Sequence, residues 1–217
     1  MSEPDLSSTP RTALRRHAER GHADRQALYA VLDAALICHL GVVAAGAPRV
    51  LPTAYARVGD TVYLHGSTAN ASYRAAAGRE VCVTVTLLDG LVYARSVFSH
   101  SMNYRSAMIF GVARPVTDPP ERSAALRAIT EHLTPGQWSY ARQPTRKELA
   151  ATSVLALPLT EASVKIRAGG PSDEPEDHAM DVWAGVVPVA VVFGAPQADA
   201  ALRHGIGVPG HVRRHAS

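Results

Sequence analysis

Cationic and hydroxyl side chains recur in this sequence where predicted β-strands end. The run Tyr-Leu-His-Gly-Ser at 63–67 ends one strand, and Arg74 lies in the helix that follows. The other members of this set are Arg95, Ser96, Tyr104, Arg105, Ser106, Lys165, Arg167 and Trp183. Guanidinium groups bind phosphate through paired hydrogen bonds, hydroxyls complete such a site, and an aromatic ring can cover a planar ligand. The set therefore suits a phosphorylated planar cofactor.

Other kinds of catalytic or metal site have no support in the sequence. No Walker loop, GxGxxG, HExxH or GxSxG motif occurs. The histidine pair at i,i+4 spacing, His211 and His215, lies in a tail without a predicted helix, so neither a zinc nor a heme site is predicted. Cys38 and Cys82 each lie in an apolar run, which indicates buried, inert thiols.

Composition indicates one folded domain. The chain has 217 residues, of which 47% are hydrophobic and 19% charged, which excludes a disordered protein, a collagen and a coiled coil. No apolar run reaches the ~18 residues of a membrane span, and the N-terminus lacks the apolar region of a signal peptide, so we expect a cytoplasmic protein with no membrane partner. The net charge of +3 comes from the two ends, so no nucleic-acid partner is expected.

Short strands joined by turns predominate along the chain. Predicted helices cover 24–35, starting at Asp24, then 68–77, 118–133, and a short helix that begins with a capping box of Thr145 and Glu148. Predicted strands cover 36–43, 49–58, 61–66, 80–88, 91–97, 106–116 and 154–167, and an apolar run covers 182–194. Gly59-Asp60 and Asp89-Gly90 predict hairpin turns, and 98–104 predicts a polar loop. The pattern favours an antiparallel barrel with appended helices.

An ordered set of segments makes the interpretation more specific. LPTAY, DTVYLHGS, VCVTVTLLDGLVYARS, NYRSAMIFGVA, SVKIR and VWAGVVP together resemble the pyridoxamine 5′-phosphate oxidase-like flavin-nucleotide-binding proteins, which include relatives linked to nitroimidazole resistance. The resemblance implies a mainly β (α+β) fold, an antiparallel split β-barrel of Greek-key type with short peripheral helices. It also implies a homodimer with FMN at the subunit interface. The implied organisation is a flexible N-terminal segment at 1–23, an FMN-binding domain at 24–190 and a C-terminal tail at 191–217.

The resemblance also assigns roles to individual residues. Leu51, Pro52 and Thr53 would lie against the flavin ring, and His65, Gly66 and Ser67 beside the isoalloxazine and ribityl chain. Arg74 would meet the phosphate, Ser106 would approach from the paired strand, and the partner subunit would donate Trp183. Arg95, Ser96, Tyr104 and Arg105 are the further strand-end candidates. Lys165 is expected near N1 of the reduced flavin, and His65 is the candidate catalytic hydrogen-bond donor or acid.

The C-terminal region departs from true pyridoxamine-phosphate oxidases. In those enzymes a basic run that grips the substrate phosphate closely follows a tryptophan, whereas here the residues after Trp183 are AGVVPVAVVFG. Pyridoxal-phosphate synthesis is therefore not expected. The prediction is an FMN-dependent oxidoreductase acting on a small organic substrate. Two alternatives stay open, a flavin carrier or sensor without turnover and a split-barrel reductase that uses the deazaflavin F420.

Overall fold

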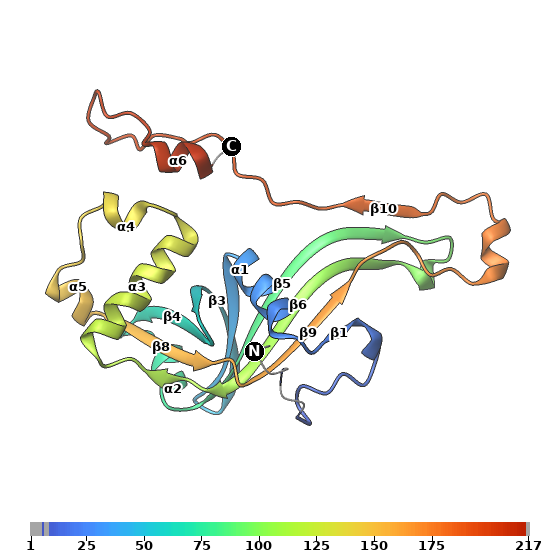
Figure 1. The fold of residues 1–217 in the computed structure, drawn as a ribbon, viewed down its shortest axis with the longest axis horizontal. Coiled ribbons are helices and arrows are strands. Elements are labelled where there is room, and N and C mark those ends of the chain that lie inside the picture. The colour runs from blue at the N-terminus through green and yellow to red at the C-terminus, as the bar shows by residue number, and fades with distance from the viewer. Residues whose placement is uncertain (1–5, 7–8, 216–217) are drawn as a thin grey trace.

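Antiparallel strands form one sheet that bends into an open barrel (Figure 1). The computed structural model describes residue 6 and residues 9–215. Its 10 strands follow the order β1-β9-β6-β5-β2-β3-β4-β8-β7, with β10 paired to β5. Because β1 and β7 stand at opposite ends of this order, the sheet does not close on itself. The predicted antiparallel split barrel with peripheral helices is confirmed.

The bounds of the elements follow the chain. The strands are β1 (Gly21–His22), β2 (Ile37–Ala44), β3 (Ala47–Val58), β4 (Thr61–Ser67), β5 (Glu80–Tyr93), β6 (Ser101–Val112), β7 (Arg114–Pro115), β8 (Thr152–Pro158), β9 (Glu161–Arg167) and β10 (Gly185–Pro188). The α-helices are α1 (Arg25–Ala34), α2 (Ala71–Ala76), α3 (Pro119–Leu133), α4 (Gln137–Tyr140), α5 (Arg146–Ala150) and α6 (Gly210–His215). Short 3₁₀-helices are η1 (Ala18–Arg20), η2 (Val97–Ser99) and η3 (Pro175–Ala179).

Three predicted helix starts are confirmed, because each is set by a local cap. The Asp24 carboxylate accepts the backbone N–H of Ala27 at 2.8 Å, and α1 buries Leu28, Val31 and Leu32 in the barrel core. The Asp118 carboxylate starts α3 by accepting the N–H of Glu121 at 2.9 Å. Thr145 and Glu148 form the expected capping box of α5. A side chain that satisfies an unpaired N–H of the first turn stabilises a helix by about 1 kcal/mol.

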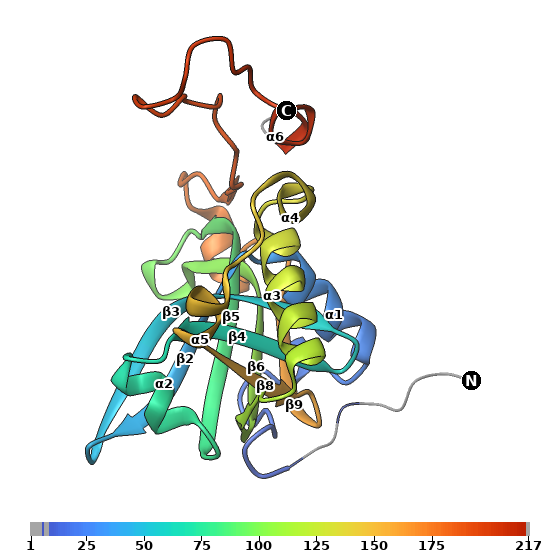
Figure 2. The ribbon, with the colours of Figure 1, turned by 90° about the vertical axis from the view of Figure 1, so that its left-hand side faces the viewer.

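Strand β4 has a covered surface on both sides. Val62 and Leu64 are fully buried in the barrel core. Since strand side chains alternate between faces, Tyr63 and His65 point to the other side, where α3 packs across β3, β4 and β8 (Figure 2). The Tyr63 hydroxyl donates to Glu121 of α3 at 3.0 Å, which ties this helix to the strand.

The predicted hairpin at Asp89-Gly90 is wrong. Strand β5 runs straight through these residues, and its register against β6 only shifts between Leu88 and Gly90. The Asp89 carboxylate accepts two hydrogen bonds from Arg105 of β6, at 2.7 and 2.9 Å. On the other edge, Pro188 of β10 pairs with Gly90, where a Cβ would lie 3.0 Å from the Val186 side chain. Glycine here permits the close approach of β10, and no turn is formed.

Three further boundaries differ from the prediction. The single strand expected at 154–167 is two strands separated at Leu159-Thr160, because β8 pairs with β4 and β7 whereas β9 pairs with β6 and β1. Strand β6 begins at Ser101, inside the segment expected to be a polar loop. The tail forms α6, although no helix was predicted there. The hairpin across Gly59-Asp60 is confirmed, since Val58 pairs with Thr61.

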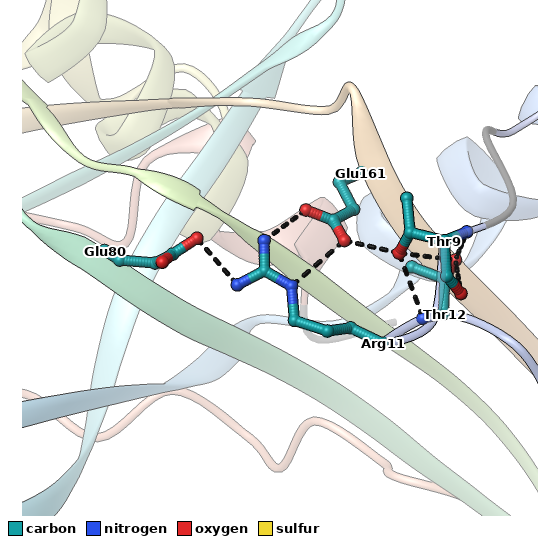
Figure 3. A network of polar contacts seen from close by, with 5 residues as sticks. All are labelled: Thr9, Arg11, Thr12, Glu80 and Glu161. Atoms are coloured by element: carbon teal, nitrogen blue, oxygen red, sulfur yellow. Dashed lines mark hydrogen bonds and ion pairs between the residues drawn. The ribbon is translucent and has the colours of Figure 1, made fainter.

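The segment before α1 is bound to the barrel by charge (Figure 3). Arg11 donates to Glu80 at 2.6 Å and to Glu161 through Nε at 3.0 Å, and Thr9 also donates to Glu161. These donors lower the pKa of the Glu161 carboxyl, with Arg11 the larger cause. Strand β1 then pairs with β9.

Membrane insertion through a helix finds no support in the described part of the chain. None of its helices combines the length and apolar character needed to cross a bilayer.

The contact between Gly66 and Tyr73 predicts a size limit at position 66. A Cβ there would lie 2.7 Å from a ring carbon of Tyr73, which is itself 3% exposed. Gly66→Ala should therefore lower the free energy of unfolding by about 1–3 kcal/mol, because the buried ring cannot move away without strain. Urea denaturation measures this, with Gly170→Ala as the matched control, since a Cβ at 170 meets nothing within 4 Å. Equal losses in the two variants would contradict the packing described here.

Candidate functional site

A pocket of about 450 Å³ lies between β4 and the helical layer formed by α3, α4 and α5. Helix α3 contributes Leu126, Ile129, Thr130 and Leu133, and the segment after it contributes Thr134, Gln137, Trp138 and Ala141. The remaining lining residues are His65, Arg142, Gln143, Pro144, Glu148, Leu149 and Thr152. The exposed surface of the walls is mostly apolar, the imidazole comes from β4, and the charged side chains come from the segment 142–148. A concave apolar site with a few polar groups is the usual form of a small-ligand pocket.

His65 brings to this pocket a buried polar atom that lacks a partner among the described residues. Its Nδ1 atom is buried and makes no hydrogen bond to any residue that the structure describes. Burial lowers the pKa of the imidazole, because the charged form loses its hydration, so the neutral ring with a free lone pair is favoured. An unpaired buried polar atom costs about 1–3 kcal/mol. The arrangement therefore suits a ligand that bonds to neutral imidazole.

Helix α4, one wall of the pocket, is held from two sides. The Glu131 carboxylate accepts the backbone N–H groups of Gly136 at 2.7 Å and of Trp138 at 2.9 Å, and these two bonds lower its pKa. From outside, His211 of α6 lies 2.9 Å from the side-chain oxygen of Gln137. Figure 1 shows the tail returning from β10 to place α6 beside α4. The wall is thus positioned by α3 and by the C-terminal tail together.

Charge at the rim of the pocket is confined to one ion pair. Arg142 donates to the two carboxylate oxygens of Glu148 at 2.7 and 3.0 Å. Arg142 is the largest cause that lowers the pKa of Glu148, to about 2, and bonds from Thr145 add to it. The neighbouring Gln143 donates its side-chain amide to the carbonyl of Trp138 at 2.6 Å.

Part of the site predicted from the sequence meets around the start of α2. The Thr53 and Tyr73 hydroxyls lie 2.8 Å apart, and Gly66 lies against the Tyr73 ring. Arg74 is exposed and donates to the carbonyl of Thr68 at 3.1 Å. The neighbouring predicted residues are Leu51 and Pro52 on β3 and Ser67 at the end of β4. His65 belongs to the same strand, and its side chain lines the pocket under α3.

The other predicted residues lie on the arm made by β5, β6 and β9, and on the segments joined to it. Most already have partners within the chain. Ser106 and Lys165 face each other across β6 and β9; the Ser106 hydroxyl donates to the Lys165 carbonyl at 3.3 Å, and Lys165 Nζ donates to the Arg16 carbonyl at 3.0 Å. The other contacts are the ion pairs Arg95–Asp173 at 2.9 Å and Arg105–Asp89, the hydrogen bond from the Phe98 N–H to Ser96, the pairing of Tyr104 with Arg167, and the Trp183 ring 5.7 Å from that of Tyr93. Among the described residues, no hydrogen bond or ion pair joins this group to the residues around α2. Figure 1 shows the arm extending away from the barrel.

The lining residues of α3 and α4 were missed by the sequence analysis. Leu126, Ile129 and Leu133 recur at the spacing of one helical face, and this stripe was the available signal. A stripe of this kind more often marks a core contact than a ligand site, so it does not by itself indicate a pocket. No group of three or more metal-binding side chains occurs within the described ranges.

The comparisons with known proteins cover almost the whole chain. The family model described as pyridoxamine 5′-phosphate oxidase matches residues 24–166. The structure of the flavocytochrome Anf3 from Azotobacter vinelandii is 37% identical and has a TM-score of 0.92, covering 98% of this chain and 99% of its own. The FAD and heme binding protein from Mycobacterium smegmatis is 39% identical with a TM-score of 0.86, covering 91% of this chain and 97% of its own.

A more distant match shows the fold alone. A protein proposed to confer 5-nitroimidazole resistance in Bacteroides thetaiotaomicron is 24% identical with a TM-score of 0.56, over 67% of this chain and 86% of its own. The search of curated proteins finds no match.

The ion pair at the rim predicts a pH-dependent contribution to stability. Since the pKa of Glu148 falls from 4.5 to about 2 on folding, its contribution is fully present above pH about 4.5 and is lost as the pH falls towards 2. The difference in unfolding free energy between the parent and Glu148→Gln should therefore be constant at neutral pH and shrink on acidification. It should also shrink with added salt, because both side chains are largely exposed. Leu126→Ala, a neutral change in the same pocket, should give a difference that does not depend on pH, and the same behaviour in Glu148→Gln would refute the prediction.

Proposed function

The chain belongs to the pyridoxamine 5′-phosphate oxidase family, and from this membership we propose that it is a flavin- and heme-binding redox protein whose heme is held in the His65 pocket. The observation that carries the proposal is the buried, unpaired Nδ1 of His65 in an apolar pocket. Similarity to a flavocytochrome and to an FAD and heme binding protein supports it, since both match nearly the full length of the chain.

The residues of the pocket fit a heme. Leu126, Ile129 and Leu133 offer an apolar wall to a flat macrocycle, and Trp138 offers an aromatic one. The neutral imidazole favoured by burial is the form that binds a metal, and one axial histidine is sufficient to hold heme iron. When bound, the heme would supply one-electron chemistry. The sequence predicted no heme site because its one histidine pair at i,i+4 spacing, His211 and His215, lies in the tail, and a lone histidine such as His65 gives no pattern of that kind.

For the flavin we propose the surface around the start of α2. Leu51, Pro52 and Thr53 of β3 would lie along the ring, with Gly66 and Ser67 of β4 beside it. Arg74 would bind the phosphate, because it is exposed and its guanidinium donates to a single carbonyl, that of Thr68. FMN was expected from the sequence, and FAD is named for the mycobacterial protein; the two share the isoalloxazine ring, the ribityl chain and the first phosphate. The 39% identity with that protein supports FAD, and FMN and F420 are the alternatives.

The predicted residues around α2 and those on the arm do not meet within one chain, and a homodimer would bring them together. Ser106, Lys165 and Trp183 lie on or beside the arm, which exposes Leu88, Leu91 and Met102 to 41–49% in one chain. A second copy that covered this apolar surface would bring its arm residues to the flavin. We propose a cytoplasmic oxidoreductase of this form acting on a small organic substrate, and a carrier or sensor without turnover is the alternative.

Removal of the imidazole tests the heme site. His65→Ala should weaken heme binding at least about tenfold, about 1.4 kcal/mol, because the iron loses its axial ligand. The measurement is titration of heme into the heme-free protein, followed by the Soret absorption band. His178→Ala, which removes an exposed histidine of η3, should titrate like the parent, and flavin content should be unchanged in both. An unaltered Soret titration in His65→Ala would refute the assignment.

Removal of the phosphate ligand tests the flavin site. Arg74→Ala should weaken FMN by about ten- to a hundredfold and leave riboflavin nearly unaffected, since one charge-assisted contact to phosphate is worth about 1.5–3 kcal/mol. Quenching of flavin fluorescence measures both affinities. Arg79→Ala removes an exposed arginine just after the same helix and serves as the control. Equal losses for FMN and riboflavin would show that Arg74 does not meet the phosphate.

A further inference from the structure

The His65 pocket is lined by one buried and one exposed nitrogen-bearing side chain. His65 lies on β4 at its floor, and Arg142 belongs to the segment between α4 and α5 at its rim. Apolar side chains such as Leu126, Ile129 and Leu149 line the same pocket. A ligand that fills this space therefore needs an apolar body, one group that bonds to neutral imidazole, and an edge that tolerates or prefers a cation.

Arg142 has unused hydrogen-bonding capacity. Its contacts to Gln143 at 2.8 Å and to Glu148 at 2.7 and 3.0 Å use three N–H groups. A guanidinium carries five such donors in a rigid plane. Its side chain is 67% exposed, and the remaining two donors, on Nε and Nη2, have no partner among the described residues.

We propose that Arg142 binds the carboxylates at the edge of the heme and so makes the pocket selective for a macrocycle with a free anionic edge. This inference rests on the proposed heme site. Carboxylate is the group that a guanidinium fork binds best, and a rim position leaves the anion partly hydrated, which avoids the cost of burying charge. Arg142 is a specificity-determining residue in this scheme, and it takes no part in bonding to the iron.

Glu148 opposes this selection. Its carboxylate accepts one hydrogen bond from each Nη atom of Arg142 and lines the same pocket, so it neutralises the guanidinium and repels the carboxylates of the ligand. Loss of Arg142 and loss of the Glu148 charge both break the ion pair, yet they should change ligand selectivity in opposite directions. A purely structural role for the pair predicts the same effect for both.

The experiment compares heme with its dimethyl ester, which has the same iron and macrocycle but an uncharged edge. Each is titrated into the heme-free protein and followed by the Soret band, and the ratio of the two affinities is the readout. The parent should prefer free heme by about ten- to a hundredfold. Arg142→Gln should reduce that ratio to near unity, Arg142→Lys should keep part of it, and Glu148→Gln should raise it. Arg146→Gln, an exposed arginine of α5 outside the pocket lining, is the control and should keep the parental ratio.

The outcomes separate this inference from the proposal beneath it. If the parent binds both compounds equally, or if Arg142→Gln keeps the parental ratio, the role of Arg142 is refuted and the heme site stands. If Arg142→Gln and Glu148→Gln shift the ratio in the same direction, the pair is structural and the inference is overturned. If the parent binds neither compound, the heme site fails, and the inference fails with it.

Discussion

The rest of the site depends on one constraint, the burial of the His65 Nδ1 atom without a hydrogen-bond partner among the described residues. Strand β4 buries Val62 and Leu64 in the barrel, so its period of two turns Tyr63 and His65 towards the helical layer. The Tyr63–Glu121 bond then fixes α3 over the strand, and α4 and α5 enclose the remaining space. A histidine in this position costs stability unless something bonds to it. A ligand that bonds to the imidazole, such as a metal centre with an open coordination position, would restore that stability.

In this pocket the buried polar group is neutral and the charged groups are exposed. The floor holds a neutral ring, because burial lowers the pKa of His65, and the full charges of Arg142 and Glu148 stay at the rim, where water screens them. The Glu131 carboxylate lies outside the pocket lining and accepts hydrogen bonds from the backbone N–H groups at the start of α4. This separation keeps the interior apolar enough for a macrocycle and leaves one cation at the edge. It also makes α6 relevant to the site, since His211 contacts Gln137 of the same wall.

The features that were predictable from the sequence are those set by neighbouring residues. The caps at Asp24 and Asp118 and the capping box at Thr145 are local, and all three helix starts are confirmed. Asp89-Gly90 satisfies the local rule for a turn, but pairing of β10 along β5 and the bonds from Arg105 keep the strand extended, and no local pattern records those partners. In the same way His65 was recognisable as a residue near a strand end, whereas its pocket depends on residues of α3 to α5 that lie far away in sequence. The split barrel was predictable from the family resemblance, because an ordered series of weak motifs constrains a fold more strongly than any of them alone.

The most direct test of the central claim is the chromophore content of the full-length parent protein, after reconstitution with heme and flavin and removal of unbound ligand. Alkaline pyridine converts heme to a product with a known absorption spectrum, and mass spectrometry of the released flavin identifies FMN, FAD or F420. We expect heme and one flavin nucleotide, each equimolar with the chain. A protein that retains a flavin but takes up no heme would contradict the assignment of the His65 pocket, and a protein that retains neither would contradict the proposed function as a whole.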